Sequence, residues 1–404
     1  MAGGGVRTIS KEESLVTLQG YRVFDADAHG IFSPRMWEGL PAEYARRRPR
    51  PVRVGDAADM GRYDTGWLIE GRMEPHPFGP GAQSANTPRW VLEEFGASPD
   101  GPGPAAGTID FPIPIGSLDL SDPQARLHNL DRMGIDTQML FPSTLYAHMT
   151  SDPGFEAALY RAYNRYMARQ CQFNPRRLKW AGLLPLRDPR QGCEALEEMQ
   201  ALGATAAVVF GTVGERLLSH RSFTPVWDEF ARTGLPLCIH MGMSYPPFEQ
   251  LCESIFDANV IAKALPAQLA FVAIVGHNML DRYPDLNVAF LEFGAEWILY
   301  AVGKMEHSLK VNKRRMPVTD GLPRRRIEEY ARSGRIFVSA EADDAVLVQE
   351  MELLGEDQIL CSSDFPHGEM RENSHVQILH RGDLSERQKR KLLYDNSVRL
   401  FGEP

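Results

Sequence analysis

Histidine and acidic residues follow several apolar runs of this 404-residue chain, at the points where strands would end. Asp27 and His29 end the run FDADAH, His240 closes LPLCIH, Glu292 closes NVAFLE and Asp364 closes ILCSSD. Because Asp27 and His29 are two residues apart, both side chains point to the same side of an extended strand. Imidazole and carboxylate without thiolate suit Zn²⁺, with Mn²⁺ or Fe²⁺ as alternatives. We therefore predict one divalent metal ion held by Asp27, His29, His240 and Asp364.

Each ligand also has a purely structural explanation. A histidine that ends an apolar strand, such as His240, is often a hydrogen-bonded structural residue. Asp364 in SSDFPH has the sequence of a helix cap and turn, and Asp25 and Asp27 could be turn residues. The metal interpretation is favoured because four ligand-type residues fall at the ends of three separated apolar strands.

Acid–base groups are predicted beside the ion. Asp364 and Glu292 are the candidate proton carriers, and either carboxylate serves decarboxylation or hydrolysis. His277, in IVGHNML ahead of the strand that ends at Glu292, is a third catalytic candidate. Its structural alternative is a hydrogen bond to a backbone carbonyl.

Three further residues are predicted to contact the substrate. His367 lies three positions after Asp364 in a Pro-containing turn and either orients that turn or meets the substrate. Arg72 and His76, in EGRMEPHP, could bind a substrate carboxylate, which a guanidinium pairs with bidentately. The alternative explanation is that both residues are exposed on a lid and do not contact the substrate.

The elements that must position these residues follow a βαβα rhythm from Asp122 onward, in which apolar runs such as DTQMLFP and AAVVF alternate with amphipathic helical patterns such as FEAALYRAYNRYMARQC. Apolar runs without alternation are typical of parallel strands buried on both faces, and about eight are present. This predicts an α/β fold, a distorted (β/α)8 TIM barrel of the metal-dependent hydrolase type, whose strand ends meet at one mouth. An open doubly wound sheet is the alternative, but no GxGxxG turn follows a strand.

Two segments stand apart from the barrel. Residues 1–20 are predicted to be a flexible leader, and 21–404 a single barrel domain. Residues 46–117 are rich in Pro, Gly and Arg and are predicted to be a long insertion after the first strand. Connections of this length are commonly lids or binding loops, so we expect the insertion to cover the mouth and set substrate size.

Composition limits the partners. A net charge of −9 and the absence of long basic runs disfavour nucleic acid and anionic membranes, which leaves a small molecule as the expected ligand. No stretch resembles a signal peptide or an uninterrupted membrane span. The five cysteines are scattered and form no CxxC pair, so neither disulfides nor a thiolate zinc site is expected, and a reducing cytoplasm fits best.

A family resemblance supports the metal site. FDADAH, RMGIDTQMLFPS, NPRRLKWAGLLPL, GLPLCIH, DRYPDLNVAFLEFGAEWI, SSDFPHGE and YDNSVRLFG occur in an order and spacing that resemble the aminocarboxymuconate-semialdehyde decarboxylase-like branch of the amidohydrolase superfamily, from about Tyr21 to Gly402. The resemblance implies that Asp27 and His29 match the HxH metal motif, and that His240 and Asp364 are the histidine of strand 5 and the aspartate of strand 8. It also implies a homodimer. Glu292 stands where decarboxylases of this branch commonly have histidine, and Asp27 replaces the first histidine of HxH.

The branch implies a reaction class. We expect a non-oxidative decarboxylase or carbon–carbon lyase that acts on a small cyclic or unsaturated carboxylate. A metal-dependent hydrolase of an amide, lactone or C–C bond is the first alternative, and a barrel that binds a ligand without turnover is the second.

Overall fold

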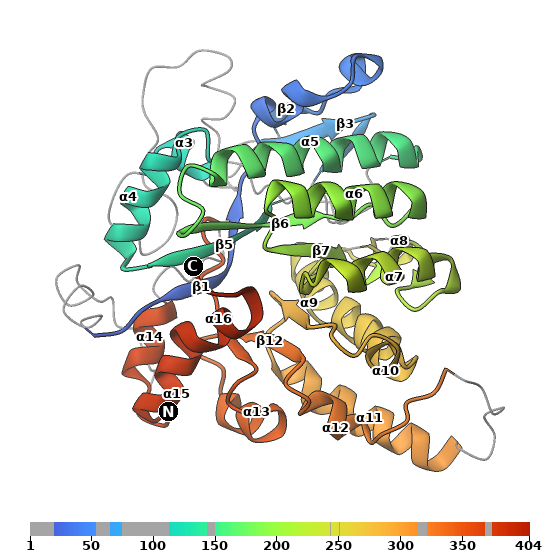
Figure 1. The fold of residues 1–404 in the computed structure, drawn as a ribbon, viewed down its shortest axis with the longest axis vertical. Helices are drawn as coiled ribbons and strands as arrows, with labels where there is room; N and C mark the ends of the chain where they lie inside the picture. Colours follow the sequence, from blue (N-terminus) through green and yellow to red (C-terminus); the bar gives the residue numbers. More distant parts are fainter. Residues whose placement is uncertain are drawn as a thin grey trace.

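The computed structural model describes residues 20–53, 65–74, 113–143, 150–242, 244–249, 251–312, 321–367 and 374–404. Its centre is an eight-stranded sheet in the order β1-β5-β6-β7-β10-β11-β12-β13 (Figure 1). Each strand pairs in parallel with the next one in that order. The strands are β1 (Phe24–Gly30), β5 (Thr137–Pro142), β6 (Leu178–Leu183), β7 (Ala206–Phe210), β10 (Leu237–His240), β11 (Val288–Leu291), β12 (Ile336–Ala340) and β13 (Ile359–Cys361).

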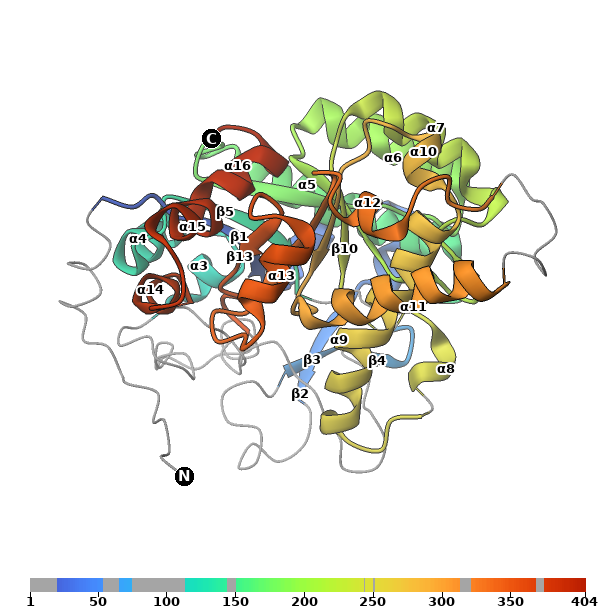
Figure 2. The same ribbon diagram turned by 90° about the horizontal axis from the view of Figure 1, so that it is seen from below.

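The strands are buried on both faces. Seven of the eight are buried at every position, and β6 has one half-buried residue, Lys179. Helices supply this cover, since they lie outside the ring of strands in both orientations (Figure 2). The apolar runs without alternation therefore became parallel strands, as predicted.

Helices fill most of the connections, and several begin at the same signal. Asp122, Asp152 and Asp188 each precede a proline at the first helical position and accept a hydrogen bond from the first turn. The helices are η1 (Pro34–Gly39), η2 (Ala42–Arg47), α3 (Ile115–Leu118), α4 (Pro123–Met133), α5 (Pro153–Cys171), α6 (Pro189–Leu202), η3 (Arg221–Phe223), α7 (Thr224–Thr233), α8 (Pro246–Glu249), α9 (Ile255–Phe271), η4 (Val272–Gly276), α10 (Met279–Arg282), α11 (Glu296–Asn312), α12 (Ile327–Ala331), α13 (Leu347–Leu354), α14 (Ser374–His380), α15 (Glu386–Arg390), η5 (Lys391–Asp395) and α16 (Asn396–Phe401).

The ring closes between its first and last strands just beyond β13. The amide of Asp364 donates to the carbonyl of Asp27 (3.0 Å), and the amide of His29 donates to the carbonyl of Phe365 (2.7 Å). These two bonds replace a full strand ladder, so the barrel is nearly closed and distorted at this seam. The predicted (β/α)8 barrel is confirmed, and two of the predicted metal-binding segments form its closure.

The insertion after β1 contains regular structure that its composition did not predict. Strands β2 (Arg50–Arg53), β3 (Thr65–Ile69) and β4 (Arg72–Glu74) form an antiparallel sheet. Trp67 of β3 is fully buried and its ring packs edge-on against those of Trp37 and Phe32. The sheet is thus anchored to the segment that follows β1. Residues 75–112, with the looser part of the insertion, and 1–19 of the predicted leader lie outside the described residues. A second antiparallel pair, β8 (Thr212–Val213) with β9 (Arg216–Leu217), follows β7.

All five cysteines are free thiols, as the scattered spacing predicted. Within the described part of the chain one helical stretch, Phe256–Gly276, is long and apolar enough to cross a membrane by length and composition alone. Half of this apolar stretch is buried inside the molecule, as in a helix that packs on a barrel, so its length and composition are weak evidence for a membrane span.

Candidate metal centre

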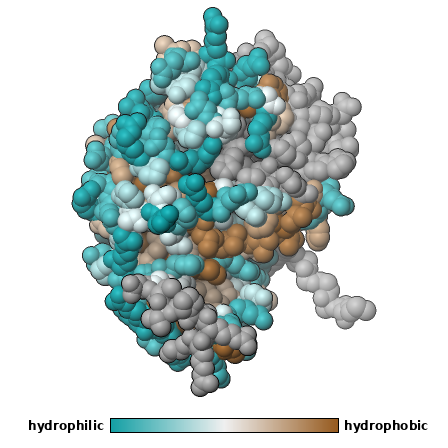
Figure 3. Space-filling view, turned by 90° about the vertical axis from the view of Figure 1, so that its right-hand side faces the viewer, coloured by the Kyte–Doolittle hydropathy of each residue, from teal (hydrophilic) through white to brown (hydrophobic). Residues whose placement is uncertain are grey.

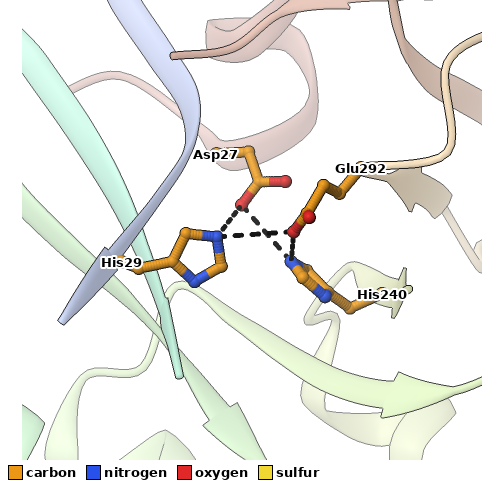
Figure 4. Close-up of side chains that lie close together, drawn as sticks. All are labelled: Asp27, His29, His240 and Glu292. Carbon is orange, nitrogen blue, oxygen red and sulfur yellow. Dashed lines mark ion pairs between the residues drawn. The ribbon is translucent and has the colours of Figure 1, made fainter. Parts of the chain in front are cut away.

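Four side chains meet at one point inside the barrel mouth, and they come from two strands and from the residue that follows a third. Asp27 and His29 come from β1, His240 ends β10, and Glu292 follows β11 (Figure 4). An extra residue in β1 between Asp25 and Ala28 forms a bulge in the pairing with β5, and Asp27 lies in it. Bulges re-aim side chains and are common beside active sites.

The four side chains are spaced as ligands of one ion would be. Nε2 of His29 lies 3.6 Å from Oδ1 of Asp27 and 3.7 Å from Oε2 of Glu292. Nε2 of His240 lies 3.6 and 3.3 Å from the same two oxygens. Ligands that share an ion at about 2.0–2.2 Å lie about 3–4 Å from one another. The observed distances fit that range.

Their hydrogen bonding also fits an ion. Both carboxylate oxygens of Asp27 and Nε2 of His29 are buried without a hydrogen-bond partner within the described residues. Nδ1 of His29 lies 3.0 Å from the carbonyl of Pro142, and Nδ1 of His240 lies 3.2 Å from that of Met241. A carbonyl at Nδ1 fixes the tautomer that leaves the Nε2 lone pair available to a metal. Buried polar atoms without partners are costly unless something charged meets them.

Asp364 and His367 form the outer side of the same cluster. Oδ1 of Asp364 lies 3.1 Å from Nε2 of His29 and 2.8 Å from Nδ1 of His367. The His367 ring stacks on that of His29, with centroids 3.9 Å apart. Asp364 (φ 54°) and Glu292 (φ 60°) both adopt the left-handed conformation, which is rare outside glycine and concentrates at functional sites. The structure therefore brings together all four predicted ligands, and adds Glu292 to the inner group.

The electrostatic environment sets the charge state that a metal needs. Burial, and then the neighbouring His367, lower the pKa of His29 to about 4, so its imidazole is neutral at neutral pH. Burial opposes ionisation of Asp364, but the His367 and His29 imidazoles hold the pKa of its carboxyl well below its usual range. Neutral imidazole beside ionised carboxylate is the form in which both bind divalent cations.

A buried polar network supports β1 behind the ligands. Both carboxylate oxygens of Asp25 are engaged, by Gln138 Nε2 (2.7 Å), Ser363 Oγ (2.6 Å) and the Ser363 amide (2.9 Å). The fully buried Arg126 donates to Gln138 Oε1 (2.9 Å) and to the carbonyl of His29 (3.1 Å). Asp25 and Arg126 thus fix the backbone on both sides of Asp27. Arg126 was not predicted as a site residue, because in the sequence it is one charged residue among several in a helical segment.

Lys263 of α9 is a second residue that sequence reasoning missed. Its Nζ lies 3.9 Å from Oε1 of Glu292, and its side chain is 25% exposed. The only available signal was a single lysine within the apolar helical run VIAKALPAQLAF. Its ammonium places a positive charge beside the Glu292 carboxylate.

The remaining predicted site residues lie elsewhere. His277 is exposed at the end of η4, where the chain leads to the start of β11, whereas the cluster lies where the strands end. The structure does not bring it to the cluster, and we give it no part in the reaction. Arg72 is exposed on β4, outside the cluster. His76 lies outside the described residues.

A ring of parallel strands that gathers imidazoles and carboxylates at its mouth defines the barrel class of metal-dependent hydrolases and their relatives. The chain belongs to the amidohydrolase family, whose model matches residues 119–402. This confirms the family predicted from the sequence.

Curated relatives include decarboxylases. The chain is 22% identical to a gamma-resorcylate decarboxylase of Polaromonas sp. over 70% of its length and 88% of that protein. It is 24% identical to a second one, of Rhizobium radiobacter, over 62% of this chain and 77% of that protein. A 6-methylsalicylic acid decarboxylase of Penicillium expansum is 23% identical over 58% and 73%.

Solved structures share the fold. An amidohydrolase of Mycobacterium avium subsp. paratuberculosis has a TM-score of 0.73 at 22% identity, covering 95% of this chain and 98% of that one. A 5-carboxyvanillate decarboxylase of Novosphingobium aromaticivorans, complexed with manganese and 4-hydroxy-3-methoxy-5-nitrobenzoic acid, has a TM-score of 0.64 at 18% identity, covering 95% and 96%.

Proposed function

We propose that this protein is a metal-dependent, non-oxidative decarboxylase of ring carboxylates that carry a hydroxyl group next to the carboxyl group. The observation that carries the proposal is the cluster of Asp27, His29, His240 and Glu292, with Asp364 beside it. Support for the substrate class comes from the relatives named after resorcylate and methylsalicylate, both of which are hydroxybenzoates.

In this proposal the inner four residues hold one divalent ion. Asp27, His29, His240 and Glu292 offer two nitrogens and two carboxylates within 4.8 Å of one another. When bound, the ion would supply positive charge that holds the substrate's oxygens and draws electron density from the ring. Zinc was predicted from the sequence, but the extra carboxylate and the manganese bound by solved relatives favour Mn²⁺.

Asp364 is the proton carrier in this scheme, because Glu292 is used as a ligand. Its side chain is 14% exposed and so reachable from the mouth. As a carboxylate it accepts the proton of the substrate's hydroxyl group and then donates it to the ring carbon that bears the carboxylate. The bond from that carbon to the carboxylate breaks, its electron pair returns to the ring and CO2 leaves. His367, 2.8 Å from Asp364, orients the carboxyl group and stabilises its charge.

Lys263 and the neighbouring cleft would hold the substrate. The ammonium of Lys263 attracts a carboxylate toward Glu292 and the ion. The register of β7 with β10 places Phe210 opposite His240. Phe210 also lines a cleft whose other walls include Leu184, Val209, Thr212, Ser244 and the ion pair of Glu156 with Arg187. Apolar walls with a few polar groups suit an aromatic acid.

Product analysis distinguishes the proposal from its alternatives. Mn²⁺-loaded protein is incubated with a panel of 2-hydroxybenzoates in D2O and in H2¹⁸O. Decarboxylation releases CO2 and leaves one deuterium on the vacated ring carbon. A product that carries ¹⁸O without CO2 release would instead establish a hydrolase, and no turnover of any panel member by metal-loaded protein would favour a binding barrel.

A second copy of the chain is the proposed partner besides the small molecule, and the cytoplasm is the proposed compartment. Figure 3 shows a band of hydrophobic surface on one side of the molecule. Exposed apolar side chains include Phe256 (76%) and Val260 of α9 and Tyr300 of the adjacent α11. A homodimer would cover such a surface. Light scattering of the purified protein tests this, and a monomeric mass at micromolar concentration would contradict it.

A further inference from the structure

A second group of acidic side chains lies outside the barrel mouth. Glu296 is the first residue of α11, Asp344 follows β12, and Glu350 is in the first turn of α13. One carboxylate oxygen of each lies within 4.8 Å of the other two. Oxygens that share one Ca²⁺ at about 2.4 Å lie at most about 4.8 Å apart. The three segments thus meet at a distance that one such ion would span.

Glu350 gives the independent sign of a ligand. Its side chain is fully buried, and neither carboxylate oxygen has a hydrogen-bond partner within the described residues. Asp344 is only 6% exposed; its Oδ2 accepts a hydrogen bond from the amide of Glu341 (2.9 Å), and its side chain also meets the carboxyl group of Glu296. A buried carboxylate that accepts no hydrogen bond is strongly disfavoured, and the positive charge of Arg381 offsets the burial of Glu350 only in part.

Arg381 is the basic side chain that acts on Glu350, but its hydrogen bonds go to other groups. Arg381 pairs with the carboxylate of Asp383 and donates to the carbonyls of Ala342 and Asp344. Its guanidinium is thus already shared between a carboxylate and two backbone oxygens. Burial, and then the charge of Glu296, raise the pKa of Asp344 to about 8 and that of Glu350 to about 7. Without a cation, the group would therefore hold protons near neutral pH.

We propose that Glu296, Asp344 and Glu350 bind a Ca²⁺ ion that ties the start of α11 to the segment between β12 and α13. The ligands are all oxygens, which hard cations prefer, whereas the mouth offers two imidazoles. The site shares no residue with the catalytic centre, and the proposal does not depend on the proposed reaction. Glu296 is four residues after Glu292, and the intervening Gly294 has a φ of 66°. An ion bound at Glu296 would therefore also restrain the short segment that carries Glu292.

Terbium luminescence provides the test, since Tb³⁺ replaces Ca²⁺ at oxygen sites and Trp297 adjoins Glu296 in the chain. The full chain, loaded with Mn²⁺, is titrated with Tb³⁺ while tryptophan is excited. We expect sensitised emission that Ca²⁺ displaces, and that Glu350→Gln and Asp344→Asn each abolish. Glu352→Gln, an exposed acid on the same helix, and Asp27→Asn, at the mouth, should leave it unchanged.

Melting temperature gives a readout that does not depend on Tb³⁺. Ca²⁺ at about 100 times its Kd should raise the Tm of the wild-type protein by at least about 2 °C, and the Tm of Glu350→Gln should not respond. Absence of both emission and Tm shift in the wild type would overturn the proposal. So would emission that survives Glu350→Gln and Asp344→Asn, because the ion would then be bound elsewhere.

Discussion

Arg126 is predicted to be essential to the stability of the metal-binding strand although it contacts no predicted ligand side chain. It is fully buried, and burial lowers its pKa only to about 9, so it is charged at neutral pH. It donates to Gln138 Oε1, to the carbonyl of Ser117 (3.2 Å) and to the carbonyl of His29. Arg126→Met keeps much of the volume and removes the charge and all three hydrogen bonds.

The expected cost follows from what the substitution leaves behind. Three buried acceptors lose their donor, and the electrostatic attraction between the guanidinium and the buried carboxylate of Asp25 is lost. A buried acceptor left without its donor costs about 1–3 kcal/mol, so the loss of three donors sets an expected cost of about 3–5 kcal/mol. Burial raises the pKa of Asp25 to about 6, so below that pH its carboxyl is protonated and needs no counter-charge. The cost of Arg126→Met should therefore be smaller at pH 5 than at pH 8.

Urea unfolding of metal-free protein at both pH values measures this cost. The double variant Arg126→Met with Asp25→Asn should lose less stability than Arg126→Met alone, because the buried carboxylate that the guanidinium attracts is then absent as well. Metal affinity should fall about 10–100-fold in Arg126→Met, since the carbonyl of His29 loses its anchor. A loss below about 1 kcal/mol at pH 8, or equal losses at pH 5 and pH 8, would refute this account of the network.

Three further predictions concern catalysis and stability. Asp364→Asn should keep the metal and lower kcat at least about 100-fold, as expected for loss of a proton carrier. The surface variant Asp383→Asn is the control and should have the kcat of the wild type. Full activity in Asp364→Asn would exclude Asp364 as the proton carrier. Lys263→Met should raise KM for carboxylate substrates more than it lowers kcat, and an unchanged KM would remove Lys263 from the binding site. Burial lowers the pKa of His375 from 6.5 to about 4 in the folded protein. As pH falls from 6.5 to 4, this imidazole is protonated in the unfolded chain but not in the folded one, so the free energy of unfolding decreases. The difference between these two pKa values corresponds to about 3 kcal/mol of unfolding free energy. In His375→Gln the fall in unfolding free energy between pH 6.5 and pH 4, measured with urea, should be smaller by about that amount. The same pH dependence in the variant and the wild type would contradict this prediction.

The barrel and its mouth were predictable because both depend on local patterns. Uninterrupted apolar runs indicate strands buried on both faces, and a polar residue that ends such a run must lie at the mouth. Asp27, His29, His240 and Asp364 were found in this way, and the structure brings them together.

What could not be predicted depends on contacts between distant segments. Glu292 and Asp364 both follow strands, and only the folded structure distinguishes Glu292, in the inner group, from Asp364, beside His367. Arg126 and Lys263 lie on helices, where a charged residue normally faces solvent. His277 was predicted as a catalytic candidate although it precedes the strand that ends at Glu292, and the structure places it where the chain leads to the start of that strand.

The location of the ion is the most direct test of the whole account. Crystals grown with Mn²⁺ give an anomalous difference map that places the metal without reference to activity. We predict a peak about 2.0–2.3 Å from side-chain atoms of Asp27, His29, His240 and Glu292. No peak at the barrel mouth, or a peak there with the Glu292 carboxylate more than about 4 Å away, would contradict the proposed centre.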